Sequence, residues 1–427
     1  MGRGAPPDSV YIIIVGDELL AGSIRDRNGA ALAAAATGRG GRVVEMRAVP
    51  DDSDSIRAAV ETAADCCAVI LIAGGLGPTT DDLTREGVAE ALGRPLVESA
   101  EWSKQLEEWT AAGYLTPGVT NKQSLLPDGA ELVRNPYGTA ACFFARWDGR
   151  SLLALPGVPA ELAELLAGEA GRLLDEWLTG AAIPERRVRL IGVPESHASA
   201  RSGGLAELGS LEVAYYVQGA TVDVVVRSPH RHGDPSGDRP AQEVEAELLA
   251  AELALGREFG EDVYETGDRS LAEVIIDGLR SAGQTVSVAE SCTGGYLSQT
   301  LTAVPGASDV VWGGVVSYAN DAKLSLLGVS ERLLETHGAV SEQTARAMAG
   351  GMRAAAGTTW SIAVTGVAGP GGGSEQRPVG TVWFALDGPL KSARKRMLRG
   401  DREAVRARSV QLALDMLRRA IEEEAGA

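Results

Sequence analysis

A segment in the C-terminal third of the chain places hydroxyl and glycine residues between a strand and a helix. Residues 289–295 read AESCTGG and follow the apolar strand-like run 285–288. Behind them, Leu297, Leu301 and Val304 recur at helical spacing. Glycines, hydroxyls and peptide N–H groups at a helix N-terminus can hold an anion. Taken alone, the segment is equally well interpreted as a capped βα turn without a ligand.

Five further motifs follow in a fixed order. They are VPGAS at 304–308, GGVVSYANDAK at 313–323, HGAVS at 337–341, TGVAGPGG at 365–372 and PVGTVW at 378–383. The ordered set resembles the C-terminal domain of the competence/damage-inducible protein A (CinA) family, over about residues 265–423. The resemblance implies a nicotinamide mononucleotide (NMN) deamidase, which replaces an amide –NH2 by –OH and releases ammonia.

That reaction requires a nucleophile, a proton shuttle and donors for the oxyanion. With the resemblance, we predict Ser308 as nucleophile, Lys323 as its base and Tyr318 as an assisting group. Lysine acts as a base only when burial or neighbours lower its pKa from about 10.4. Ser–Lys pairs are known variants of the serine triad. Ser291 is the alternative nucleophile, and Cys292 is predicted to be a small packed residue.

The substrate contacts are predicted on loops and on the closing helix. Ligands of open α/β sheets lie at the carboxyl ends of strands, where the motifs after residues 288, 316 and 364 should meet. Arg402 and Arg406, one turn apart, could pair with a phosphate or be exposed helix charges. No cofactor is expected for deamidation. The predicted contacts are Ser291, Thr293, Gly294, Asn320, Thr365, Gly366, Gly369, Arg402 and Arg406.

A second glycine-rich loop, GGLGPTTDDLTRE at 74–86, follows the buried run 69–73. Its peptide groups could again hold an anion. Carboxylates suit Mg²⁺ or a similar divalent cation, although Thr79 or Asp82 could instead be simple N-caps. The predicted metal ligands are Asp81, Asp82 and Glu18, and the predicted nucleotide contacts are Gly74, Gly75, Gly77, Thr79, Asn28 and Asn121.

Neighbouring motifs extend this second pattern. They are GDELLAG at 16–22, NKQ at 121–123, NPYGTA at 135–140 and LPGVP at 155–159. The set resembles the N-terminal domain of the CinA family, itself similar to molybdopterin-binding domains, over about residues 9–172. The resemblance implies nucleotide binding and, in some members, metal-dependent hydrolysis of ADP-ribose. Arg27, Ala141 and Cys142 depart from the family pattern, and Cys142 adds bulk near the loop, so binding without turnover is an alternative.

Strands and helices that position these motifs alternate along the chain. This alternation predicts an α/β fold with two three-layer α/β/α domains joined by a small α+β domain. The resemblance implies that the small domain is the KH-like middle domain of the family. A single helix is predicted over 160–178, and Gly180 and Pro184 indicate a linker over 179–185. The predicted domains are 9–172, 185–256 and 265–423.

Composition limits the function classes. The chain has 427 residues, 40 Lys plus Arg against 58 Asp plus Glu, and a formal charge of −18. We therefore expect no nucleic-acid or membrane partner, although a local basic pocket for a small phosphate is compatible with it. The four cysteines fit neither a disulfide framework nor a zinc site. With no signal pattern and no membrane-length apolar run, we expect a cytoplasmic enzyme.

The sequence is compatible with three hypotheses about function. The first is an NMN amidohydrolase, binding small nucleotides (NMN and ADP-ribose) and forming a homodimer. The second is a molybdopterin-binding protein that uses the loop 74–82. The third is a non-enzymatic competence or damage-response factor, which the acidic charge does not support as a DNA binder.

Overall fold

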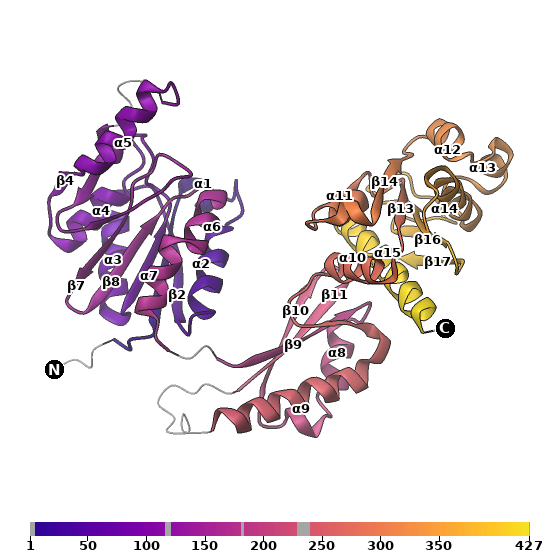
Figure 1. The fold of residues 1–427 in the computed structure, drawn as a ribbon, viewed down its shortest axis with the longest axis horizontal. Coiled ribbons are helices and arrows are strands. Elements are labelled where there is room, and N and C mark those ends of the chain that lie inside the picture. Colours follow the sequence, from indigo (N-terminus) through magenta and orange to yellow (C-terminus); the bar gives the residue numbers. More distant parts are fainter. Residues whose placement is uncertain (1–4, 116–120, 181–182, 229–239, 427) are drawn as a thin grey trace. The chain divides into compact units, whose positions relative to one another are not determined.

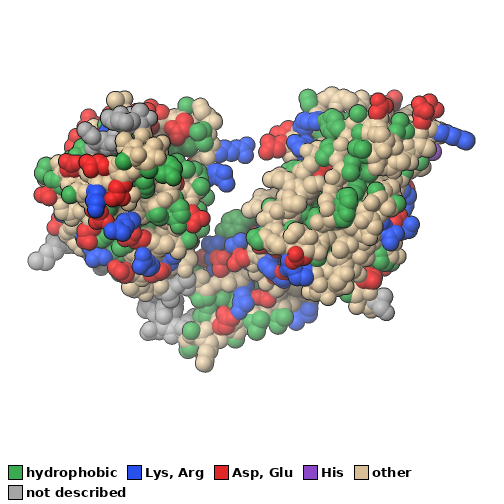
Figure 2. Space-filling model, turned by 45° about the horizontal axis from the view of Figure 1, so that its top comes forward, with side chains coloured by type: hydrophobic (Ala, Val, Ile, Leu, Met, Phe, Trp, Pro, Cys, Tyr) green, Lys and Arg blue, Asp and Glu red, His purple; other side chains and the backbone are tan. Residues whose placement is uncertain are grey.

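The computed structural model describes residues 5–115, 121–180, 183–228 and 240–426. The chain forms two compact units, Met1–Ile183 and Pro184–Ala427 (Figure 1). The division falls inside the predicted linker. The predicted mixed α/β fold is confirmed. Acidic and basic side chains lie interspersed on the surface of both units (Figure 2).

The N-terminal unit is built on a six-stranded sheet of order β2-β1-β3-β8-β7-β6. The first four are parallel, and β7 is antiparallel to both of its neighbours, β8 and β6. The central strands β1 and β3 are buried throughout, as their continuous apolar sequences require. The bounds are β1 Ser9–Val15, β2 Arg42–Val49, β3 Val69–Ala73, β6 Glu131–Val133, β7 Cys142–Trp147 and β8 Arg150–Leu155.

Helices cover both faces of this sheet. One face packs against α2 (Asn28–Thr37), α6 (Pro159–Ala167) and α7 (Glu169–Trp177). The other packs against α3 (Ser53–Cys66), α4 (Thr84–Leu92) and α5 (Ala100–Ala111). The predicted single helix 160–178 is wrong, because Gly168 leaves helical geometry at φ −113 and ψ −120 and separates α6 from α7. Smaller elements are α1 Asp17–Leu20, β4 Leu96–Glu98 and β5 Leu125–Pro127.

The second unit begins with an antiparallel sheet of order β10-β11-β9-β12. Its apolar face packs against α8 (Glu195–Ser202) and α9 (Ala241–Phe259). The strands are β9 Glu185–Ile191, β10 Glu212–Gln218, β11 Thr221–Arg227 and β12 Val263–Thr266. The sheet is thus completed by a strand that lies beyond residue 256, the predicted end of this region.

The same unit continues into a five-stranded sheet of order β14-β13-β15-β16-β17. Three helices pack on each face, which gives the predicted three layers. The strands are β13 Val286–Glu290, β14 Val311–Val316, β15 Trp360–Gly366, β16 Thr381–Asp387 and β17 Ser392–Met397. The helices on one face are α10 Leu271–Ala282, α11 Tyr296–Thr302 and α15 Arg402–Ala425; on the other they are α12 Asn320–Leu327, α13 Glu331–His337 and α14 Glu342–Ala356.

The register of the central strands determines where the motifs meet. β13, β14 and β15 are parallel, and Glu290 lies opposite both Val316 and Val364. The three loops that follow these strands therefore share one edge of the sheet, as predicted. Within the described ranges, no helix combines the length and apolarity needed to cross a membrane.

Candidate active site

A buried lysine lies at the shared carboxyl edge of β13, β14 and β15. Lys323 is 1% exposed. Its Nζ donates to the Ser317 carbonyl at 2.7 Å and to Ser291 Oγ at 3.1 Å. Desolvation by burial lowers the pKa of the lysine. The pair therefore combines a hydroxyl with an amine whose neutral form is favoured relative to an ordinary lysine.

Ser291 is held by the turn that follows β13. Its peptide N–H donates to the Val364 carbonyl at 2.9 Å, and its own carbonyl accepts from the Gly294 N–H at 3.1 Å. Gly294 and Gly295 have φ +60 and +94, a conformation that favours glycine. The glycines of the motif thus reverse the chain and present the serine to the lysine.

The buried side chain of Glu290 stabilises this turn. Its carboxylate is fully buried. Oε1 accepts from the N–H and the hydroxyl of Ser298 at 2.8 and 2.6 Å, and Oε2 accepts from the N–H groups of Gly295 and Leu297, both at 3.0 Å. The acid thereby caps the first turn of α11. Sequence reasoning assigned it no role, although a buried acid between a strand and a glycine loop signals such partners.

The predicted Ser308–Lys323 pair is not formed within the chain. Ser308 is exposed in the short turn Ala307–Asp309, which precedes β14, whereas Lys323 follows that strand. The six residues of β14 separate its two ends by about 20 Å. Ser291, the alternative nucleophile, is therefore the serine that contacts the lysine.

Tyr318 contacts an arginine rather than the base. Its hydroxyl accepts from Arg402 Nη2 at 2.6 Å, and its ring is largely exposed. Only its carbonyl approaches Lys323 Nζ, at 3.5 Å. The predicted assisting role of the Tyr318 hydroxyl on Lys323 is therefore not supported by the geometry.

The first turns of α15 connect the loops of the site. Arg402 Nη1 donates to the Gly369 carbonyl at 2.7 Å, and Arg406 Nη2 donates to the Thr293 carbonyl at 2.7 Å. Both predicted arginines therefore lie at the site. Each guanidinium has five N–H donors, so these bonds leave capacity for an anion.

The remaining predicted contacts differ in availability. Thr293 is fully buried, and its hydroxyl has no partner among the described residues. Thr365 donates its hydroxyl to the Ala339 carbonyl at 2.7 Å, and Asn320 is exposed at the start of α12. A side chain at Gly366 would collide with β16 backbone at 2.8 Å. Thr293 is thus the free donor of this set.

Cys292 is a packed residue, as predicted. It is 6% exposed, and burial raises the pKa of its thiol to about 12. The thiolate needed of a nucleophilic cysteine is therefore disfavoured.

The N-terminal unit has its own cavity, of about 400 Å³, at the carboxyl ends of β1, β3 and β8. Gly74 must be glycine, because its φ is +106 and a Cβ would approach the Val15 carbonyl at 2.2 Å. Among the predicted residues, the cavity is lined by Gly74, Gly75, Gly77, Thr79, Asp81, Asp82 and Glu18.

The predicted metal ligands do not assemble a cation site. Asp82 uses both oxygens within its loop, accepting from the Gly77 N–H at 2.8 Å, from the Thr79 N–H at 2.8 Å and from the Thr79 hydroxyl. The described residues contain no group of three or more His, Cys, Asp or Glu placed to hold a metal. Metal binding by Asp81, Asp82 and Glu18 stays a prediction. Asp82 closes its own loop and is not the N-cap of α4, which is Leu83.

A buried cation supports the same loop. Arg85 is fully buried, and its Nη2 and Nη1 donate to the carbonyls of Leu76 and Gly77 at 2.5 and 3.3 Å. Burial lowers the pKa of the guanidinium to about 10. Sequence reasoning did not single out this arginine, because it resembles any helix-start charge until its burial is known.

Asn28 and Asn121 are two further predicted nucleotide contacts, and Cys142 is one of the departures from the family pattern. Asn28 Nδ2 donates to the Gly157 carbonyl at 2.7 Å, while its Oδ1 is buried without a partner in the described chain. The side chain of Asn121 lies outside the described residues. Cys142 packs in the hydrophobic core between the sheet and α2, α6 and α7. It does not line the cavity, so its side chain does not narrow the pocket.

Comparison with known proteins follows the same division of the chain. Residues 268–421 match the CinA C-terminal domain model, and residues 11–174 match the model of a probable molybdopterin binding domain. A solved competence/damage inducible protein CihA from Agrobacterium tumefaciens is 44% identical, covering 36% of this chain and 93% of its own, with a TM-score of 0.34. A CinA-like protein from Myxococcus xanthus is 38% identical over 96% of this chain and 97% of its own. A CinA-like protein from Gemmatimonas aurantiaca is 39% identical over 98% of this chain and 97% of its own length, and the chain therefore belongs to the CinA-like protein family.

Proposed function

We propose that the C-terminal site hydrolyses the carboxamide of NMN to nicotinate mononucleotide and ammonia. The observation that carries the proposal is the contact of Lys323 Nζ with Ser291 Oγ at 3.1 Å, in a buried setting that lowers the lysine pKa. A nucleophile and a base of matched geometry are the minimum that a serine amidohydrolase needs.

The chemistry proceeds in two halves. Neutral Lys323 takes the Ser291 proton as Oγ attacks the carboxamide carbon. The lysine then protonates the departing nitrogen, which leaves as ammonia, and an acyl-serine ester remains. Water, deprotonated by the same lysine, attacks the ester, and the proton returns to Ser291 as the nicotinate carboxylate is released.

Two groups complete the arrangement. The oxyanion requires preorganised donors, and the peptide groups of the turn 291–295 and the unpartnered hydroxyl of Thr293 are the candidates. Arg402 and Arg406 supply the positive charge that a nucleotide phosphate needs.

Ammonia release from NMN by the full chain tests the proposal. We expect turnover by the wild type, a loss of about 10³-fold or more in Ser291→Ala, and turnover within about twofold of wild type in Ser308→Ala. The two serine variants are matched controls for each other. An inactive wild type would refute the activity, while loss in Ser308→Ala alone would refute the assignment of the nucleophile.

For the N-terminal cavity we propose binding of a small nucleotide, with ADP-ribose as the candidate. The supporting observation is a glycine loop around a cavity of about 400 Å³, a volume that suits a small ligand. Calorimetry with ADP-ribose, with and without Mg²⁺, tests it against a pterin ligand. Gly77→Ala should weaken binding, because a Cβ there would meet Asp82 Oδ2 at 2.5 Å. Binding of the pterin alone would favour the molybdopterin hypothesis.

A further inference from the structure

The second unit contains a cavity that is separate from the candidate active site. Its volume is about 690 Å³, within the range of small-molecule sites. It is open on one side and is bounded by the loop after β9, the β10–β11 turn, β17 with the residues that follow it, and one side of α15. Neither Ser291 nor Lys323 lines it.

Five arginines line this cavity: Arg394, Arg396, Arg399, Arg408 and Arg419. Only Arg419 is neutralised, by Asp415 at 2.9 Å, Asp262 at 3.1 Å and Glu261 at 3.2 Å. In the part of the chain that the structure describes, the other four have no carboxylate partner. The contacts that they make are to backbone carbonyls, such as Arg408 Nε to Gly219 at 3.4 Å.

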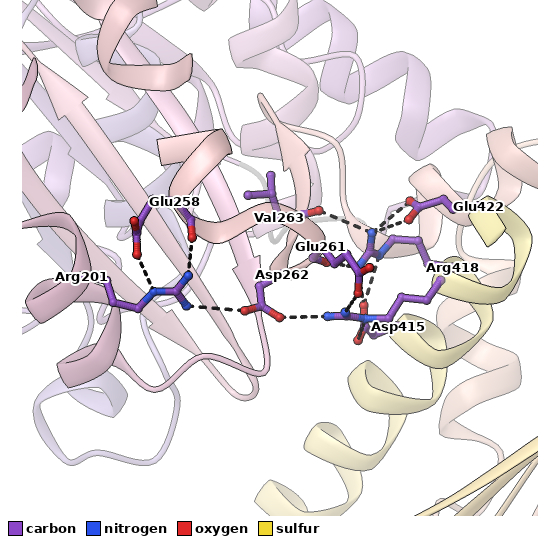
Figure 3. Close-up of polar contacts among 9 residues, drawn as sticks. Arg201, Glu258, Glu261, Asp262, Val263, Asp415, Arg418 and Glu422 are labelled. Carbon is purple, nitrogen blue, oxygen red and sulfur yellow. Dashed lines mark hydrogen bonds and ion pairs between the residues drawn. The ribbon is translucent and has the colours of Figure 1, made fainter. Parts of the chain in front are cut away.

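A network of polar contacts around Arg418, Asp415 and Asp262 fixes one wall of the cavity (Figure 3). Arg418 is 4% exposed and donates to Asp415 and Glu422 on α15, and to the carbonyls of Glu261 and Val263 before and in β12. Asp262 joins the network to Arg201 on α8 at 3.6 Å. Of the three acids that line the cavity, Asp262 and Asp415 pair with arginines of this network. Among the described residues, Glu195 is thus the one lining acid without an ion pair, against four unpaired arginines.

The concentration of positive charge here contrasts with the whole chain. Residues 391–408 contain eight lysines and arginines against two acids, in a chain of formal charge −18. Bringing uncompensated guanidinium groups together raises the free energy of the empty site, and an anion between them lowers it. Guanidinium forks bind phosphate oxygens bidentately.

We propose that this cavity binds a phosphate-bearing small molecule of the nucleoside phosphate class. The unpaired arginines hold the phosphate oxygens. The apolar side chains of Val217, Met397 and Leu412, which complete the lining, cover the uncharged part of the ligand. The inference does not depend on the proposed NMN reaction, because none of the four arginines contacts the residues assigned to it.

Calorimetry with inorganic pyrophosphate and with ADP tests the proposal on the full chain. The double variant Arg396→Gln/Arg399→Gln removes two cavity charges. Lys391→Gln/Lys395→Gln is the matched control, since it removes the same charge from the same segment but neither lysine lines the cavity. We expect the arginine variant to lose one binding event or to weaken it about tenfold or more, and the lysine variant to stay within about twofold of wild type.

Each other outcome overturns the proposal. Equal binding by all three proteins would show that the cavity is not the site. Equal losses in both double variants would indicate general screening by surface charge. A single-stranded oligonucleotide that binds through these arginines, while pyrophosphate and ADP do not, would identify a nucleic-acid surface instead. Thermal melting of the variants, which alter exposed residues only, checks that folding is unchanged.

Discussion

Arg85 and Lys323 are two buried cations beside the carboxyl ends of parallel strands, each in a different mixed sheet, and they have different chemical capacities. Each is at most 1% exposed, and each donates to backbone carbonyls of the glycine-rich or edge loops. Burial lowers both pKa values. At about 10, the pKa of Arg85 still leaves the guanidinium protonated at neutral pH.

The comparison distinguishes a buried cation that orders a loop, Arg85, from one that can act as a base in the proposed reaction, Lys323. A guanidinium keeps its proton after burial and so orders the loop 76–77 as a fixed donor. An amine loses its proton more readily on burial, and Lys323 lies 3.1 Å from the serine hydroxyl that it deprotonates in the proposed reaction. Burial of a cation is therefore no sign of a catalytic base unless the group can be neutral and faces a nucleophile.

The largest expected effect comes from exchanging one cation for the other. Lys323→Arg retains positive charge but no accessible neutral form, and Lys323→Met retains approximate length without charge. We expect both to lower kcat for NMN deamidation by about 10³-fold or more. Substantial turnover in Lys323→Arg would mean that charge, rather than proton transfer, is what this position supplies.

The next effect concerns the stability of the N-terminal unit. Arg85→Met leaves the carbonyls of Leu76 and Gly77 without their donors, which should lower the free energy of unfolding by about 1–3 kcal/mol. Urea denaturation of the full chain measures it, with Arg57→Met on the outer surface of α3 as the control. NMN turnover should be unchanged, and a parallel loss of turnover would contradict the separation of the two sites.

A smaller effect is the pH dependence of stability that Lys323 contributes. Because its folded pKa is lowered, the unfolded state binds more protons between that value and about 10.4, and stability rises with pH across this window. The penalty is fully present below the folded pKa. The stability of Lys323→Met relative to wild type should therefore fall as pH rises toward 10.4, by about 1.4 kcal/mol per pH unit. A constant difference would show that burial does not perturb this lysine.

The smallest expected effect is at Cys292, the residue that follows Ser291. Burial raises the pKa of Cys292 to about 12, so iodoacetamide at neutral pH should leave it unmodified in the folded protein. Cys66, which is exposed, is the internal control and should be alkylated. Mass spectrometry of the labelled peptides distinguishes the two sites, and labelling of Cys292 at the rate of Cys66 would contradict its packed state.

The interior strands were predictable because a parallel strand covered on both faces must be apolar throughout. In residues 42–49, polar and apolar side chains alternate less clearly. The bounds of this strand nevertheless follow from the turns on either side of it. β17 was missed because its sequence, SARKRM, is polar and exposed at the sheet edge. Gly168 was read as part of a helix, since apolar periodicity continues across it.

The location of the site was predictable, but its pairing was not. Loops after parallel strands must meet at one edge, which placed Ser291 and Lys323 in the same region. Their contact depends on how α12 packs against α14 after β14 ends, which no local spacing reveals. The separation of Ser308 from Lys323 could have been predicted from sequence, because a residue that precedes a parallel strand lies at the opposite edge; the role of Ser308 stays a prediction.

The length of α15 connects the C-terminal end of the chain to the candidate active site. Arg402 and Arg418 belong to the same continuous helix, and their Cα atoms are separated by about 24 Å along its axis. The first contacts active-site loops, and the second is anchored to the neighbouring sheet. A frameshift or early stop codon after residue 415 would therefore remove none of the candidate active-site residues. It would nevertheless remove the contacts that hold the far end of the helix carrying Arg402 and Arg406.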